Sequence, residues 1–143
     1  MKLFAFERDD GRPALGALID DTTCADLSTA GLPDTLDALL CQGEAGLAAA
    51  RAAVERGAPR TPLADLRWLP PVQAPAKAFA IGLNYLDHAA ESSFDPPKHP
   101  VVFHRFPSSW VGHERPIVRP QVSTQFDYEA ELVAVIGKAG HRI

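Results

Sequence analysis

The sequence predicts an α+β protein that is mainly β, and three patterns support this fold class. Two short apolar segments, 2–6 and 13–19, flank the turn sequence Asp-Asp-Gly, as the strands of a β-hairpin do. Leucines and alanines at helical spacing then follow over 36–56. In 128–137, side chains alternate with the period of two that is typical of a strand.

Two short helices are expected after the hairpin. The leucines before Gly43 fall at helical spacing, and this glycine is a plausible C-terminal stop. The alanine-rich stretch 44–56 ends before Gly57 and places Leu47 and Val54 on one face. It therefore predicts a second helix with a modest apolar stripe.

A domain boundary is expected in the proline-rich stretch between residues 57 and 75. Its five prolines fix φ and remove backbone donors, which excludes regular structure over most of the stretch. We therefore expect a small α/β amino-terminal domain at 1–70 and a second domain at 71–143.

The second domain has its own pattern of short elements. A buried strand is expected at 77–81, followed by a short helix that ends at Glu91 and a proline-rich loop at 94–100. Further strands are expected at 101–106 and 117–119.

Composition excludes several classes of protein. The formal net charge is −4 and the cations are scattered, so no basic stripe exists to bind nucleic acid. No apolar run is long enough to span a membrane, and the amino terminus lacks a signal peptide's apolar region. Cys24 and Cys41 have no metal-type spacing, so we expect two reduced thiols in a cytoplasmic protein.

Glu129 and Glu131 are candidate metal ligands. Two residues apart in a strand, they would point to the same side, about 7 Å apart along the backbone. Burying unpaired carboxylates costs several kcal/mol each, a cost that Mg²⁺, Mn²⁺ or Ca²⁺ would offset. Alternatively, both glutamates simply face water. Asp127 shares their parity and could join the site or cap the strand.

His88 and Glu91 are candidate catalytic residues. Three positions apart on a helix, they would lie on one face within hydrogen-bonding reach. A carboxylate beside an imidazole makes a general base that can take a proton near neutral pH. Such pairs are also frequent on ordinary helix surfaces. Asn84, before the helix, is as plausible a turn residue as a ligand contact.

Arg105 interrupts an apolar strand with a group suited to bidentate carboxylate binding, although a surface arginine is the default interpretation. Ser109 and its neighbour Ser108 lack a histidine partner for nucleophilic catalysis, so they are loop or oxygen-contact candidates only.

Three segments closely resemble the fumarylacetoacetate hydrolase family, both in their residues and in their order along the chain. They are the G-x-N-Y-x-x-H-x-x-E motif at 82–91, V-V-F-H-R-F-P-S-S at 101–109 and D-Y-E-A-E-L at 127–132. The resemblance runs from about residue 71 to the end of the chain. The first part resembles the variable leading domain of many bacterial members.

This resemblance implies a mixed β-roll catalytic domain that pairs into a homodimer. Glu129 and Glu131 would be ligands of Mg²⁺ or Mn²⁺, with Ca²⁺ as an alternative, and His88 with Glu91 would activate water. The implied substrate-binding residues are Tyr85, Arg105 and Ser109. Position 105 is lysine in many relatives, and the family's third metal ligand is an aspartate expected beyond Ile143, which would make the chain incomplete.

The reaction implied is hydrolysis of a carbon–carbon bond in a small acylpyruvate-like or fumarylacetoacetate-like diketo acid, through a metal-stabilised enolate. The same scaffold also supports an oxaloacetate decarboxylase, a lyase or an isomerase acting on a 2-oxo acid. A non-catalytic fragment or interaction module, which pairs through an open strand edge, is the alternative from another class.

Overall fold

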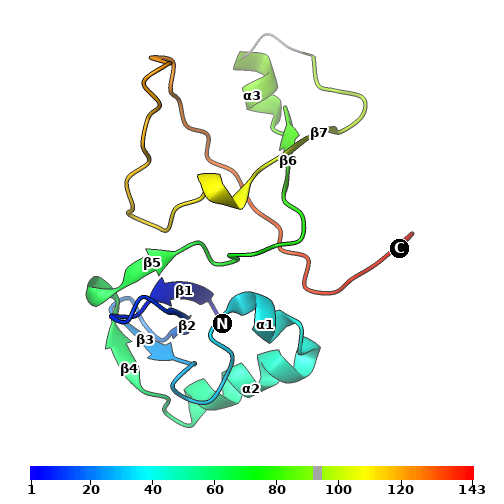
Figure 1. The fold of residues 1–143 in the computed structure, drawn as a ribbon. Helices are drawn as coiled ribbons and strands as arrows, with labels where there is room; N and C mark the ends of the chain where they lie inside the picture. The colour runs from blue at the N-terminus through cyan, green and yellow to red at the C-terminus, as the bar shows by residue number, and fades with distance from the viewer. Residues whose placement is uncertain (92–94) are drawn as a thin grey trace. The chain divides into compact units, whose positions relative to one another are not determined.

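The computed structural model describes residues 1–91 and 95–143, and the chain divides into two compact units (Figure 1). The first unit comprises Met1–Gln73 and Val111–Ile143, and the second comprises Ala74–Trp110. The two-domain division at residues 70 and 71 stays a prediction. Within the described residues, no helix combines the length and apolar character needed to cross a membrane.

A five-stranded antiparallel sheet forms the centre of the first unit, with strand order β4-β3-β2-β1-β5. Its strands are β1 Leu3–Glu7, β2 Pro13–Leu18, β3 Thr23–Asp26, β4 Arg60–Pro62 and β5 Arg67–Leu69. The hairpin expected from the sequence is confirmed, since β1 pairs with β2. Gly11 has a φ of +80° in the connecting turn, a conformation that glycine adopts without steric cost.

The expectation of little regular structure between residues 57 and 75 is wrong. Strands β4 and β5 and the 3₁₀ turn η1, Leu63–Asp65, all lie there. Both strands are three residues long and occupy the two edges of the sheet. Proline is tolerated at an edge because its missing N–H is not needed on the open side of the ladder. Pro62 therefore fits at the end of β4.

The two predicted helices are confirmed as α1, Leu36–Leu40, and α2, Gly43–Glu55. The Thr35 hydroxyl accepts a hydrogen bond from the Ala38 amide at 3.2 Å and caps α1. Gly57, with a φ of +81°, follows the end of α2, as expected for a helix stop.

The buried face of α2 is formed by small residues. Gly46, Ala50 and Ala53 are its buried residues, whereas Leu47 and Val54 are only partly buried. A Cβ atom on Gly46 would lie 2.6 Å from the Leu39 carbonyl oxygen, so glycine permits the close contact with α1. The predicted Leu47 and Val54 stripe therefore lies at the margin of the core.

Helices α1 and α2 cover one face of the sheet, and the core lies between the helices and this face (Figure 1). Leu15, Leu27 and Leu39 are fully buried there. On the other face Phe4 contacts Trp68, with ring centroids 4.8 Å apart. The Phe4 ring also covers Gly16, where a Cβ atom would be 2.5 Å away.

Asp20 closes the turn between β2 and β3. Its carboxylate accepts hydrogen bonds from the Thr22 and Thr23 amides at 2.9 and 2.8 Å and from both hydroxyls. These bonds, led by that from the Thr22 amide, lower the pKa of Asp20 from 3.8 to about 2. A lowered pKa means that this stabilisation is present above pH 3.8 and is lost as the pH falls through about 2.

We expect Asp20→Asn to lower the midpoint of thermal unfolding slightly at neutral pH. The amide oxygen can still accept the bonds made to Oδ1, but without a charge, and the amide nitrogen cannot accept from the Thr23 hydroxyl. The difference from wild type should shrink between about pH 4 and about pH 2. Circular dichroism melts across this range measure it, with Asp21→Asn as the matched exposed control. A difference that stays constant down to pH 2 would contradict the stated cause.

The second unit contains a two-stranded antiparallel sheet and two short helical segments. Its elements are β6 Phe79–Gly82, α3 Leu86–Glu91, β7 Val101–His104 and the 3₁₀ turn η2 Pro107–Ser109. The strands expected at 77–81 and 101–106 are confirmed, but they are not buried: Phe79 is 53% and Val102 54% exposed. Of the predicted loop 94–100, residue 94 lies outside the described residues, and 95–100 form no regular element.

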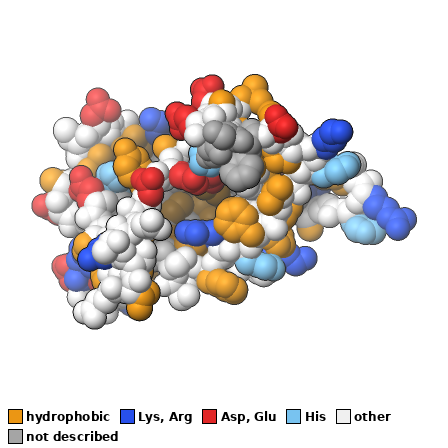
Figure 2. Space-filling model, turned by 90° about the horizontal axis from the view of Figure 1, so that it is seen from above, with side chains coloured by type: hydrophobic (Ala, Val, Ile, Leu, Met, Phe, Trp, Pro, Cys, Tyr) orange, Lys and Arg blue, Asp and Glu red, His pale blue; other side chains and the backbone are white. Residues whose placement is uncertain are grey.

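The strands predicted at 117–119 and 128–137 are wrong in this structure, where both segments are irregular. A strand is stabilised by pairing with a neighbour, and the described residues offer these segments none. Their apolar side chains stay exposed, as Val118 at 86% and Leu132 at 90% show. Figure 2 likewise shows hydrophobic side chains at the surface. The described chain is thus mixed α and β, with two sheets and three short α-helices.

Candidate active site

The second unit brings the G-x-N-Y-x-x-H-x-x-E motif onto a strand, a turn and a helix. Strand β6 ends at Gly82, residues 83–85 form a turn, and α3 begins at Leu86. Leu83 in this turn has a φ of +52°, a left-handed conformation that costs a non-glycine residue about 1 kcal/mol or more. The connection is short, so α3 begins close to the end of the strand.

Helix α3 carries both predicted catalytic residues. His88 is partly buried and Glu91 is exposed. Because they are three positions apart on a helix, their side chains lie on the same side of α3, as predicted. Ala89 is buried, at 1% exposure, and its amide bonds to the Tyr85 carbonyl at 3.1 Å. Tyr85 itself is 44% exposed.

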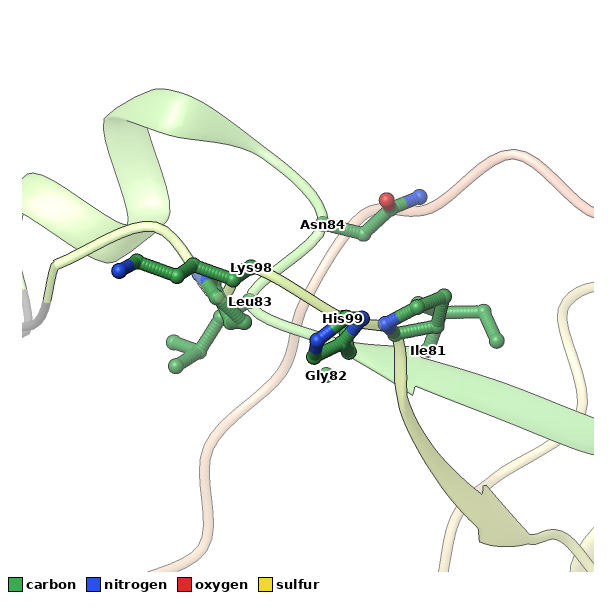
Figure 3. Close-up of a pocket in the computed structure, with 8 residues that line it drawn as sticks. Ile81, Gly82, Leu83, Asn84, Lys98 and His99 are labelled. Carbon is green, nitrogen blue, oxygen red and sulfur yellow. The ribbon is translucent and has the colours of Figure 1, made fainter.

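A cavity of about 170 Å³ lies beside this turn, between residues 81–84 and 97–100 (Figure 3). Its polar lining residues are Asn84, Lys98 and His99. The Asn84 and Lys98 side chains point in opposite directions in Figure 3, so they do not converge on one ligand position. Lys98 was not singled out from the sequence, since an isolated lysine after two prolines gives no signal of a site.

The residues that follow β7 have local roles in this structure. The Arg105 amide extends the ladder by bonding to the Ala78 carbonyl at 3.1 Å, while its side chain is exposed. The Ser109 hydroxyl donates to the Phe106 carbonyl at 2.8 Å and closes η2. Both side chains belong to the same unit as His88 and Glu91. Their predicted role in substrate binding stays a prediction.

Glu129 and Glu131 lie in the first unit, in the irregular segment that precedes the carboxyl terminus, and both are exposed. The neighbouring Asp127 carboxylate accepts a hydrogen bond from the Tyr128 amide at 2.8 Å. Outside positions 92–94, no three His, Cys, Asp or Glu side chains are grouped closely enough to hold a metal ion.

The donor chemistry of this acidic pair fits a hard divalent cation. Carboxylate oxygens are the ligands that Mg²⁺ and Mn²⁺ prefer, and the two glutamates are separated by one residue. The strand that would place both on one face is not formed here. The pair therefore offers two suitable ligands, and further ligands are needed to complete a coordination shell.

The free cysteines give no competing site. Cys24 is buried in β3 and Cys41 is exposed after α1, and neither forms a disulfide, as predicted. Burial raises the pKa of the Cys24 thiol, which disfavours the reactive thiolate.

Comparison with known proteins places the carboxyl-terminal half in one family. Residues 77–143 match the model of the fumarylacetoacetate (FAA) hydrolase C-terminal family. The human mitochondrial oxaloacetate tautomerase FAHD2A is 42% identical over 112 residues, which cover 78% of this chain and 36% of that protein. The oxaloacetate tautomerase fahd2 of Xenopus laevis is 36% identical over all of this chain and 46% of its own length.

Two bacterial proteins extend the comparison. The 4-hydroxyphenylacetate degradation bifunctional isomerase/decarboxylase of Salmonella dublin is 47% identical over 73 residues, which cover 51% of this chain and 17% of that protein. The crystal structure of a putative HpcE protein from Mycobacterium smegmatis matches 84% of this chain and 41% of its own, with a TM-score of 0.60 and 28% identity.

The chain spans between about a third and a half of the tautomerases to which it was compared. The family match covers the segments that contain His88, Glu91, Glu129 and Glu131. Sequence, family model and structural likeness agree, and this chain belongs to the fumarylacetoacetate hydrolase family.

Proposed function

We propose that the protein is an enzyme that interconverts the keto and enol forms of a small 2-oxo acid, with oxaloacetate as the first substrate to test. The supporting observation is the match of residues 77–143 to the family model, together with relatives whose names describe oxaloacetate tautomerases. The reaction requires removal of a proton from C3 and protonation of the C2 oxygen, with no leaving group.

His88 is the proposed acid–base residue. Its imidazole would take the C3 proton and return one to the oxygen, which is the task of a general base that works near neutral pH. Glu91, one helical turn further along α3, would orient the ring and fix its tautomer. Both residues come from the same six-residue helix, so they would move together.

Glu129 and Glu131 are the proposed ligands of a divalent cation, Mg²⁺ or Mn²⁺, with Ca²⁺ as an alternative. When bound, such a cation supplies positive charge that stabilises a developing enolate oxygen. Tyr85, Arg105 and Ser109 remain the proposed substrate contacts. Arg105 suits a substrate carboxylate because its guanidinium presents paired donors in a fixed geometry.

Hydrolysis of an acylpyruvate is the second candidate. Here His88 would remove a proton from water, the hydroxide would add to the distal carbonyl, and cleavage would release a carboxylic acid and pyruvate. Decarboxylation of oxaloacetate would instead need no activated water. The printed names of the relatives include tautomerase, isomerase and decarboxylase activities, which favours the non-hydrolytic reactions.

An assay with two substrates tests the proposal. We expect the protein with Mn²⁺ to accelerate the loss of the ultraviolet absorbance of enol-oxaloacetate without releasing pyruvate. Acetylpyruvate should stay intact under the same conditions. Release of acetate and pyruvate from acetylpyruvate would favour the hydrolase, whereas no acceleration of either reaction would contradict both enzymatic proposals and favour the interaction module.

We also propose that the protein forms a homodimer and is cytoplasmic, as predicted from the sequence. The vertebrate relatives named above are described as mitochondrial proteins. Sedimentation of the purified protein at several concentrations would measure its oligomeric state.

A further inference from the structure

We propose that the amino-terminal half of the chain positions the acidic segment, residues 127–132, by holding the chain on either side of this segment, at Gly112 and at Gly137. Between these points lie Glu129 and Glu131. The inference rests on the proposed function for the role of the two glutamates. The family model begins at residue 77, so it assigns no role to the amino-terminal sheet and helices.

The first point is a close contact between Gly112 and the backbone of β5. A Cβ atom on Gly112 would overlap the carbonyl group of Trp68 and would lie 2.8 Å from the Leu69 amide nitrogen. Backbone cannot yield as a flexible side chain can, so only glycine fits. Strand β5 is an edge strand, which leaves one side of its backbone open to this segment.

Side chains reinforce this contact. The His113 ring packs edge-on against the Trp68 indole, with centroids 5.6 Å apart and planes at 86°. Trp68 is itself held by the Phe4 ring. The Arg115 amide then bonds to the Gly112 carbonyl at 3.1 Å and closes a turn directly after this contact. We call residues 112–113 and Trp68 the clasp.

The second point lies near the carboxyl terminus. Gly137 lies beside α1, where a Cβ atom would be 3.7 Å from a Leu40 methyl group. This spacing is ordinary van der Waals contact, so a methyl group can be added there without displacement. Leu40 in turn packs against the buried core of the first unit.

The two points together restrict a span that lacks regular structure. Residues 114–136 form no helix or strand, so their own backbone hydrogen bonds do little to order them. Fixing both ends reduces the number of conformations of the span before any cation binds, and a preorganised pair of ligands binds more tightly. The amino-terminal half thereby contributes to metal affinity without supplying a ligand.

A spin label at Ala130→Cys tests the clasp, in a Cys41→Ser background that removes the exposed native thiol. We expect Gly112→Ala to make the label clearly more mobile, because the added methyl group forces the clasp open. Val122→Ala, which shortens a side chain that is 96% exposed in the same span, is the control and should leave mobility unchanged. If circular dichroism shows that Gly112→Ala does not fold, His113→Ala replaces it, since this change removes the ring contact without a clash.

Titration of the unlabelled proteins with Mn²⁺ tests the positioning role. The electron paramagnetic resonance signal of the unbound ion measures how much Mn²⁺ remains free. The dissociation constant for Mn²⁺ should rise roughly tenfold in Gly112→Ala and stay unchanged in the control. A tenfold loss is at the lower end of the losses found when residues that support metal ligands are replaced. Unchanged label mobility, or normal Mn²⁺ affinity despite a mobile label, overturns the inference. If wild type takes up no Mn²⁺ while the label responds as expected, the metal site fails and the clasp stands.

Discussion

His88→Ala is expected to lower the turnover of enol-oxaloacetate roughly 10²- to 10⁴-fold, the usual contribution of a positioned general acid–base group. The proposed reaction moves a proton in both of its steps, and alanine can neither accept nor donate one. Because His88 is only partly buried in a short helix, its removal should leave the fold intact. Steady-state rates and circular dichroism of the same samples measure both effects.

His141→Ala is the matched control, since this histidine is exposed and lies outside the motif. Its rate should equal that of wild type. Glu91→Gln should give a smaller loss than His88→Ala, because it removes the orienting charge but keeps the base. A His88→Ala protein with unchanged turnover would show that the i, i+3 pair is an ordinary helix-surface pair.

Replacing both Glu129 and Glu131 by glutamine is expected to raise the dissociation constant for Mn²⁺ at least roughly 100-fold, the upper end of the loss found for mere outer-shell partners. Glutamine keeps the size of each side chain but removes the two negative charges that a hard cation prefers. Both residues are exposed, so stability should change little. Titration with Mn²⁺ and thermal melts of the same samples test this directly.

Glu55→Gln is the matched control, because it removes one exposed carboxylate of the same unit outside the acidic segment. Its Mn²⁺ affinity should be that of wild type. If the double variant still binds Mn²⁺ as wild type does, the two glutamates merely face water, which is the alternative that their strand spacing leaves open. Activity without added metal in wild type would contradict the metal dependence separately.

Local patterns predicted the amino-terminal unit well. The hairpin depends on a turn sequence and on alternation within each strand, and both act between neighbours in the chain. Helix α2 ends before Gly57 because a left-handed glycine stops a helix wherever the helix lies. Such signals need no knowledge of the rest of the fold.

Contacts between distant segments were not predictable in the same way. The small-residue face of α2 reflects how closely α1 approaches Gly46, and Gly112 is required because β5 lies against it. The sequence around Gly46 or Gly112 does not distinguish either residue from a glycine in an ordinary loop. The strands β4 and β5 were missed because a proline is acceptable only at a sheet edge, and sequence alone does not show which strands are edges.

The acidic segment shows the same contrast between local patterns, which the sequence reveals, and long-range contacts, which it does not. Alternation at 128–137 predicted a strand, yet the segment is irregular here, because alternation specifies which side chains share a face but pairing supplies the hydrogen bonds. By itself the sequence determined the family, through motifs that the family model also matches, and the residue types available for chemistry. Only the tertiary structure decided which backbone groups meet, since close approach and pairing depend on residues far apart in the chain.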